Sequence, residues 1–103
     1  TLYNRATALL HTSIYEGFGI PVIEAMQAGC PVVAAPCTAV AEAGGDALLM
    51  SGAATPEAMV PLVQRCLDPQ ARAGVVARGI ELARRFSWAR TNRATVDILE
   101  QYL

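Results

Sequence analysis

Residues 8–35 read ALLHTSIYEGFGIPVIEAMQAGCPVVAA, with two short apolar runs on either side of an amphipathic segment. The runs at residues 8–11 and 31–35 have the length and apolar character of buried strands. Residues 21–28 predict a helix, because proline stands at the first position and Gly29 follows the last. A strand, a helix and a second strand in this order predict a βαβ unit, in which the two strands are parallel.

The rest of the chain predicts one more strand and three more helices. A third apolar run, residues 47–50, is the strand. Apolar stripes predict helices over residues 56–67 and 70–85, and Ser87 is a suitable N-cap for a last helix over residues 87–103. The fold class is therefore α/β, with about three parallel strands, flanking helices and a helical C-terminus. Such a sheet is thin, so at least one edge is expected to have lost its natural neighbour.

The length and composition fit one globular domain. The chain has 103 residues, 53% of them hydrophobic and 17% charged, with a net charge of −1. One hydrophobic core can form at this length, and the balanced charge excludes the basic surface that nucleic-acid binding requires. Three cysteines, an odd number without C-x-x-C spacing, favour neither a disulfide framework nor a zinc site.

The expected location is the cytoplasm. No apolar run approaches the roughly 18 to 20 residues that span a bilayer, and no signal-peptide pattern stands at the start of the sequence. Reduced cysteines fit the same compartment. All eight basic residues are arginine and alanine is abundant, which points to a bacterial genome of biased composition.

The loop at residues 11–19 is the expected place of a binding site. Ligands of open α/β sheets lie outside the carboxyl ends of the strands, and this loop leaves one such end and enters a helix. Gly17 and Gly19 permit close approach of a ligand to the backbone, and the N-terminus of the next helix favours a phosphate or a sugar hydroxyl. Two glycines taken alone are more often only a tight turn.

Four other side chains each have a plain structural alternative. The apolar residues of the first helix would share its buried face, which leaves Glu24 on the opposite side. Glu24 and Glu16 are then equally well explained as solvated surface charges. His11 is expected to be packed or half-exposed rather than catalytic, because no serine, cysteine or metal-ligand partner is spaced for it. Trp88 is expected to anchor packing rather than to bind a sugar.

The combined pattern resembles a known family. Residues 13–34, SIYEGFGIPVIEAMQAGCPVVA, are similar to the E-x7-E region of retaining glycosyltransferases of family 4, which have the GT-B fold. The similarity extends over nearly the whole chain, through residues 45–49, 56–58 and 86–88. The resemblance implies that residues 1–103 form a partial Rossmann-like domain, the C-terminal portion of the donor-binding domain of a longer enzyme.

The resemblance also implies a role for each residue of the motif. Glu16 would hydrogen-bond a hydroxyl of the transferred sugar and stabilise positive charge at the anomeric carbon, which makes it the expected catalytic residue. Glu24 would bind the ribose hydroxyls of the nucleotide, since two vicinal hydroxyl donors suit one carboxylate. The sugar and the diphosphate would lie against the loop residues Gly17, Phe18, Gly19 and Ile20.

Other parts of the site are expected to lie outside this chain. The family is usually assigned a front-face mechanism without a stable covalent intermediate, so no nucleophile, cofactor or metal is expected here. The basic residues that neutralise the diphosphate and the N-terminal domain that binds the acceptor would be missing. Membrane association would also depend on that missing domain. The isolated chain is therefore expected to be inactive.

Three functions stay open on the sequence alone. The first is transfer of a hexose from a nucleotide-diphosphate sugar to an acceptor. The second is a non-catalytic nucleotide-sugar-binding or interaction module. The third and least favoured is a glycosidase, which would need Glu16 and Glu24 as an acid and nucleophile with carboxyl groups about 5 Å apart.

Overall fold

The computed structural model describes residues 2–103, and its elements follow the predicted order with two additions. Every predicted strand and helix is present, but the third strand is shorter than predicted because Ala47 lies in a short 3₁₀ helix. This 3₁₀ helix and one further α-helix are the additions. In chain order the elements are β1 (Leu9–His11), α1 (Ile20–Gln27), β2 (Val32–Ala34), α2 (Thr38–Gly44), η1 (Gly45–Ala47), β3 (Leu49–Met50), α3 (Pro56–Arg65), α4 (Pro69–Ala83) and α5 (Trp88–Glu100).

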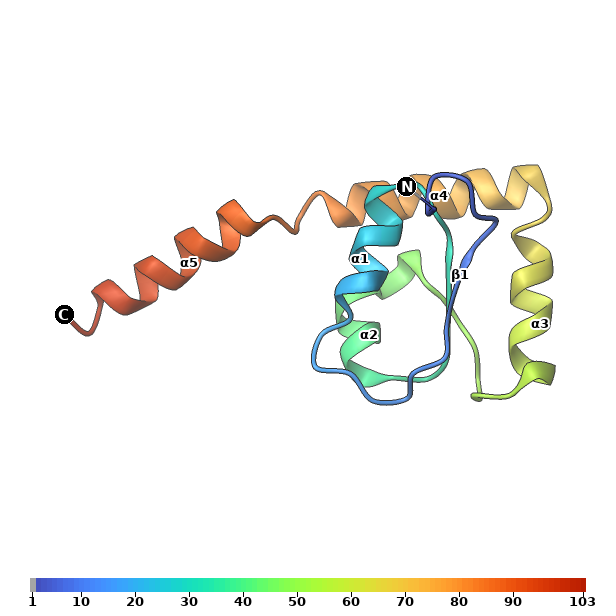
Figure 1. Ribbon diagram of the computed structural model, residues 1–103, viewed down its shortest axis with the longest axis horizontal. Helices are drawn as coiled ribbons and strands as arrows, with labels where there is room; N and C mark the ends of the chain where they lie inside the picture. The colour runs from blue at the N-terminus through green and yellow to red at the C-terminus, as the bar shows by residue number, and fades with distance from the viewer. Residues whose placement is uncertain (1) are drawn as a thin grey trace.

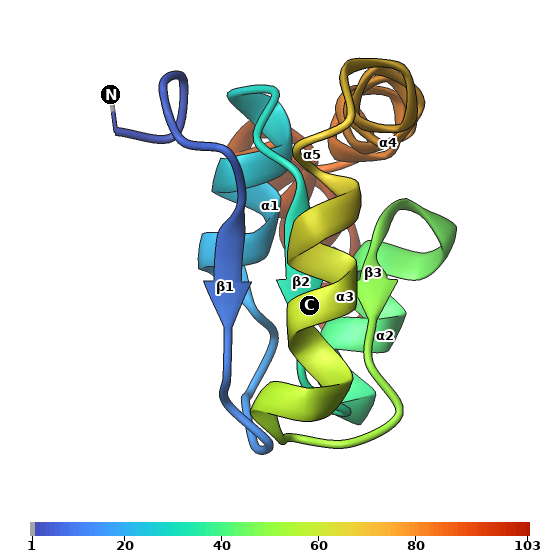
Figure 2. The same cartoon turned by 90° about the vertical axis from the view of Figure 1, so that its right-hand side faces the viewer.

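The three strands form one parallel sheet in the order β1-β2-β3, which confirms the α/β class and a partial Rossmann-like architecture. Figure 2 shows the three arrows side by side and pointing the same way. Leu10 of β1 pairs in register with Val33 of β2. Val33 is fully buried whereas Leu10 is 50% exposed, so β2 is the centre of the sheet and β1 is a thinly covered edge.

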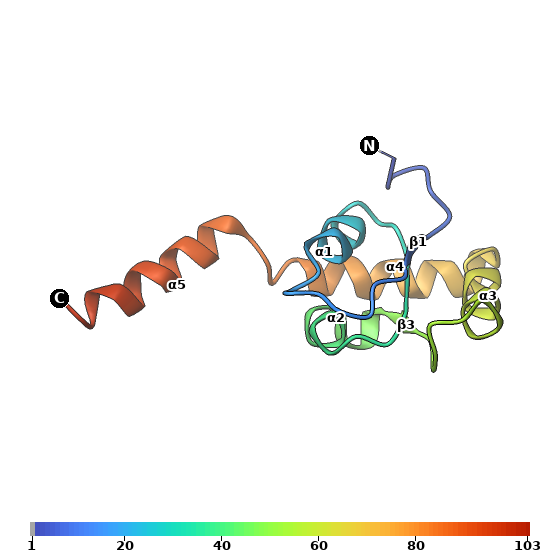
Figure 3. The same cartoon turned by 60° about the horizontal axis from the view of Figure 1, so that its bottom comes forward.

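Two apolar clusters fill the space on the two faces of the sheet. Figure 3 shows α1 and α2 on one side of the strands and α3 on the other. The cluster under α1 and α2 includes the buried residues Val22, Met26, Val32 and Val40. The cluster under α3 includes Val33, Leu49, Met59 and Cys66.

Helix α4 lies across one end of the layers and contributes to both clusters. Ala83 belongs to the cluster under α1 and α2, and Val75 belongs to the cluster under α3. The contact of α4 with α1 is close at Gly79, where an added Cβ would lie 3.3 Å from Cγ of Met26. The predicted apolar stripe of this helix is therefore the face that joins the two halves of the core.

The end of α1 is the glycine stop that the sequence predicts. Gly29 has a φ of 72°, the left-handed conformation that favours glycine. Its N–H donates to the carbonyl of Met26 at 3.1 Å, and the N–H of Cys30 donates to the carbonyl of Ala25 at 2.9 Å. These two bonds are the Schellman arrangement, which satisfies the last carbonyls of the helix and turns the chain into β2.

Helix α2 lacks the apolar stripe and the capping side chain from which a helix is usually predicted. Its residues TAVAEAG contain one large apolar side chain, Val40, and Cys37 at the N-cap makes no side-chain capping hydrogen bond. Val40 is fully buried and Ala43 is 2% exposed. Tertiary packing, rather than a visible apolar stripe, therefore stabilises this helix.

Helix α5 extends away from the rest of the molecule (Figure 1) and buries none of its residues. Its predicted N-cap is confirmed, because the N–H of Arg90 donates to Oγ of Ser87 at 3.1 Å. The prediction that Trp88 anchors packing is wrong for this chain, since its side chain is 73% exposed. None of the helices within residues 2–103 combines the length and the apolar character needed to cross a bilayer.

The core makes Met26 a sensitive position. Met26→Ala removes a side chain that is 1% exposed, and we expect it to lower the free energy of unfolding by about 2–5 kcal/mol. Gln64→Ala, at an exposed position of α3, is the control and should change it by less than about 0.5 kcal/mol. Urea unfolding followed by circular dichroism measures both, and equal effects would contradict the assignment of the core.

Because of two buried thiols, the free energy of unfolding is expected to change with pH in the alkaline range. Burial raises the pKa of Cys30 and Cys66 above the ordinary value of 9.0, and the charge of Arg72 opposes this only in part. The folded state then holds these two protons more tightly than the unfolded state. The resulting contribution to the free energy of unfolding is complete below pH 9.0 and is lost as the pH rises through the raised pKa values. The unfolding free energy should thus fall more steeply from about pH 8 to 11 for the natural chain than for Cys30→Ala/Cys66→Ala. Parallel slopes would show that these thiols do not titrate differently on folding.

Candidate functional site

The loop at residues 12–19 lies at the carboxyl end of the sheet. Figure 2 shows it beyond the arrowheads of the strands, at the end opposite α4. The loop begins from a firmly paired strand, because the carbonyl of His11 accepts a hydrogen bond from the N–H of Ala35 at 2.9 Å. This is the end of an open α/β sheet at which ligands bind, as the sequence predicts.

Gly19 fixes the point where the loop enters α1. It is the N-cap, with a φ of 97° and no side-chain capping bond. A Cβ added there would lie 3.3 Å from Cγ2 of Val40, so the loop backbone rests directly against α2. Gly17 differs in both respects, because its φ is not positive and nothing lies within 4 Å of an added Cβ. Of the two glycines, only Gly19 is required by the local structure.

His11 and Glu16 lie together at the base of the loop. Nε2 of His11 is 3.3 Å from Oε1 of Glu16, and the two side chains are 8% and 31% exposed. Nδ1 of His11 is buried and has no hydrogen-bond partner among the described residues. Of the two structural alternatives for His11, packed or half-exposed, the structure shows the packed one, and its pairing with Glu16 is a contact that the sequence does not predict. No periodic pattern signals a contact that depends on how an irregular loop turns back toward the strand.

Phe18 joins the loop to the segment between α4 and α5. Its ring meets the ring of Phe86 edge to face, with centroids 5.6 Å apart and an angle of 69° between the planes. Nε2 of Gln27, at the end of α1, donates to the carbonyl of Phe86 at 3.5 Å. The loop before α1 and the last residue of α1 are thereby both in contact with Phe86.

A pocket of about 410 Å³ lies between α1 and the start of α5. Three of the six predicted site residues line it, namely Phe18, Ile20 and Glu24. Glu24 is exposed on the outer face of α1, as the sequence predicts. The wall that was not predicted comes from Phe86, Ser87, Trp88 and Thr91. The pocket is mostly apolar, with the Glu24 carboxylate as its one acidic side chain.

Glu16, Gly17 and Gly19 do not line this pocket. The structure therefore divides the predicted site into two parts, a pocket beside Glu24 and the loop base where Glu16 meets His11. Phe18 belongs to the loop and also to the pocket wall, so it connects the two parts.

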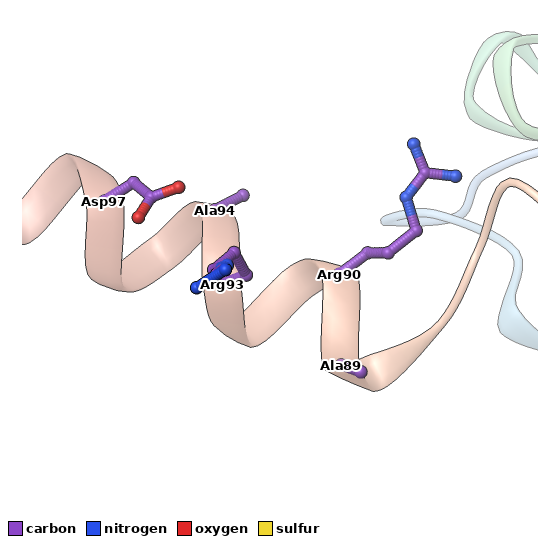
Figure 4. Close-up of a pocket in the computed structure, with 5 residues that line it drawn as sticks. All are labelled: Ala89, Arg90, Arg93, Ala94 and Asp97. Carbon is purple, nitrogen blue, oxygen red and sulfur yellow. The ribbon is translucent and has the colours of Figure 1, made fainter.

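A second hollow, of about 340 Å³, is lined by residues of one helix only. Figure 4 shows that its residues Ala89, Arg90, Arg93, Ala94 and Asp97 all come from α5. A hollow on one side of a single exposed helix lacks an opposing wall to enclose a ligand. Over residues 2–103, no cluster of three or more histidine, cysteine, aspartate or glutamate side chains is placed to hold a metal ion.

Comparison with known proteins finds relatives along nearly the whole chain. A family model described as "Glycosyl transferases group 1" matches residues 1–69. The O-antigen chain mannosyltransferase B of Escherichia coli is 36% identical over 97 residues, which are 93% of this chain and 26% of that protein. The D-inositol 3-phosphate glycosyltransferase of Saccharomonospora viridis is 36% identical over 104 residues, which are 97% of this chain and 24% of that protein. The chain thus spans about a quarter of the length of these relatives.

The two glycines of the loop offer a matched pair of substitutions. Gly19→Ala forces a side chain into a left-handed backbone and against Val40, and we expect it to lower the free energy of unfolding by about 1–3 kcal/mol. Gly17→Ala meets open space at an ordinary backbone angle and should change it by less than about 0.5 kcal/mol. Urea unfolding of both variants is the measurement. An effect of Gly17→Ala as large as that of Gly19→Ala would mean that the loop is built differently.

Proposed function

This chain belongs to the glycosyl transferases group 1 family, and from that membership we infer that it supplies part of the donor site of a retaining enzyme. The enzyme transfers a hexose from a nucleotide-diphosphate sugar to an acceptor. The observation that carries the proposal is the position of the glycine-rich loop, with Glu16 at its base and Glu24 on the helix that follows, at the carboxyl end of a parallel sheet.

Glu16 is proposed as the catalytic residue that faces the transferred sugar. Its Oε1 is directed to His11, while the side chain keeps 31% of its surface open. One carboxylate has acceptor capacity for more than one donor, so a sugar hydroxyl can bind beside the imidazole. As the bond to the leaving group breaks, the negative charge of Glu16 stabilises the positive charge that develops at the anomeric carbon.

The backbone of Gly17, Phe18, Gly19 and Ile20 is proposed to hold the sugar oxygens and the diphosphate. The start of a helix carries unpaired N–H groups and a partial positive charge. Pro21 has no N–H, and the N–H of Val22 donates to the carbonyl of Gly19 at 3.0 Å, so the donors proposed for the ligand precede Pro21. Gly19, with a φ of 97°, turns the loop backbone at the start of α1.

Glu24 is proposed to bind the ribose. Its carboxylate is exposed on α1 and borders the pocket. Two vicinal hydroxyls can both donate to one ionised carboxylate, which gives charge-assisted hydrogen bonds. The aromatic rings of Phe18 and Phe86 are part of the apolar lining of the same pocket.

The proposed enzyme is a family 4 glycosyltransferase of GT-B fold, with residues 1–103 in the C-terminal part of the donor-binding domain. The groups that neutralise the diphosphate and the domain that binds the acceptor are proposed to lie in other parts of the enzyme. We propose that the reaction needs no metal or other cofactor and that the enzyme is cytoplasmic, with membrane contact through the acceptor domain as an alternative. The isolated chain should then show no transfer.

The test compares Glu16→Gln and Glu24→Ala in the full-length enzyme. Glu16→Gln should lower kcat by about 10²–10³-fold, because it removes charge that acts in the transition state. Glu24→Ala should mainly weaken nucleotide binding, by about tenfold in Kd, or about 1.4 kcal/mol. Acceptor-dependent release of nucleotide from UDP, GDP and ADP sugars, mannose donors included, measures turnover, and calorimetry measures binding.

Glu57→Gln is the control, since it neutralises an exposed carboxylate in the first turn of α3, far along the chain from the loop. It should leave turnover and donor affinity unchanged. Normal turnover and affinity in both test variants would contradict the proposed roles. Donor binding without acceptor-dependent release would indicate a binding module instead of a transferase.

A further inference from the structure

We propose that His11 is a positioning residue, which holds the Glu16 carboxylate in the orientation that the transferred sugar requires. The inference rests on the proposed function of Glu16 and adds to it a residue that the motif does not contain. Its basis is the 3.3 Å approach of His11 Nε2 to Glu16 Oε1, together with the burial of the imidazole.

The imidazole is held more firmly than the carboxylate. His11 pairs in register with Ala34 of the central strand, its carbonyl is bonded to the N–H of Ala35, and its side chain is 8% exposed. Glu16 stands in an irregular loop between Tyr15, which is 90% exposed, and Gly17, which has open space around it. His11, which is fixed by its strand, can therefore orient Glu16, which its own loop does not fix.

Within residues 2–103, His11 is the one side chain that the structure places in ion-pair or hydrogen-bond reach of the Glu16 carboxylate. The other ring nitrogen, Nδ1, is buried without a partner. A proton on Nδ1 would be a buried donor with no acceptor, whereas a ring with its proton on Nε2 would place that donor on the side of Glu16. In that form the ring has an N–H donor 3.3 Å from Oε1 of Glu16.

An uncharged donor is compatible with the proposed role of Glu16, which is to stabilise positive charge at the anomeric carbon. A lysine or arginine in this place would hold the carboxylate but would also cancel much of its charge. Neutral imidazole fixes one oxygen and leaves the negative charge available for the anomeric carbon. The expected consequence of losing His11 is thus a misplaced carboxylate, which affects the chemical step more than donor binding.

The experiment replaces His11 in the full-length enzyme, with and without Glu16→Gln. His11→Phe keeps an aromatic ring of similar size but has no donor, and we expect kcat to fall by about 10- to 100-fold with a much smaller change in donor KM. His11→Gln places an amide N–H near the position of Nε2 and should restore most of kcat. His11→Asn is too short to do so and should stay impaired. The substrate is whichever UDP, GDP or ADP sugar supports turnover by the natural enzyme.

The double variant His11→Phe/Glu16→Gln separates positioning from a general structural effect. If His11 acts through Glu16, kcat of the double variant should equal that of Glu16→Gln alone. Additive losses, or equal activity of the Gln and Asn variants, would overturn the proposal. The Gln and Asn comparison keeps the test decisive if His11→Phe does not fold, as thermal unfolding will show. Normal turnover of Glu16→Gln would instead contradict the proposed function itself.

Discussion

The parallel pairing of β1 with β2 is the constraint on which the rest of the structure depends. Parallel neighbours cannot be joined by a tight turn, so the chain must cross from the carboxyl end of β1 back to the start of β2. Helix α1 makes this crossing, and its apolar face covers the sheet with Val22 and Met26. The loop that precedes α1 has to lie at the carboxyl end, which is where Glu16 and Gly19 are found.

The same crossing explains why the proposed site has two parts. Loop residues before α1 lie near the end of β1, so Glu16 meets His11, whereas Glu24 lies a full turn along the helix on its outer face. Two carboxylates separated in this way act on different groups of a long ligand more readily than on one bond. A sugar and a ribose joined by a diphosphate form such a ligand, and this agreement favours the proposed donor over a simple glycoside.

Local patterns in the sequence predict the individual strands, α1 and the placement of Glu24, because each depends on residues close together in the chain. Gly29 is the clearest case, since the sequence predicts that it ends the helix and the structure shows it in the left-handed conformation. Helix α2 could not be predicted in this way, because the burial of Val40 depends on tertiary contacts. The pairing of His11 with Glu16 and the pocket wall at Phe86 likewise arise only when separate segments fold together.

The contact between α1 and Phe86 also bears on the order in which the chain folds. Gln27 and Phe86 are 59 residues apart, and α2, α3 and α4 lie between them. On the ribosome, β1, α1 and β2 are synthesised long before Phe86, so the loop emerges with its aromatic neighbour still absent. During synthesis the pocket therefore cannot be completed until residues 86–91, which form its other wall, have also emerged.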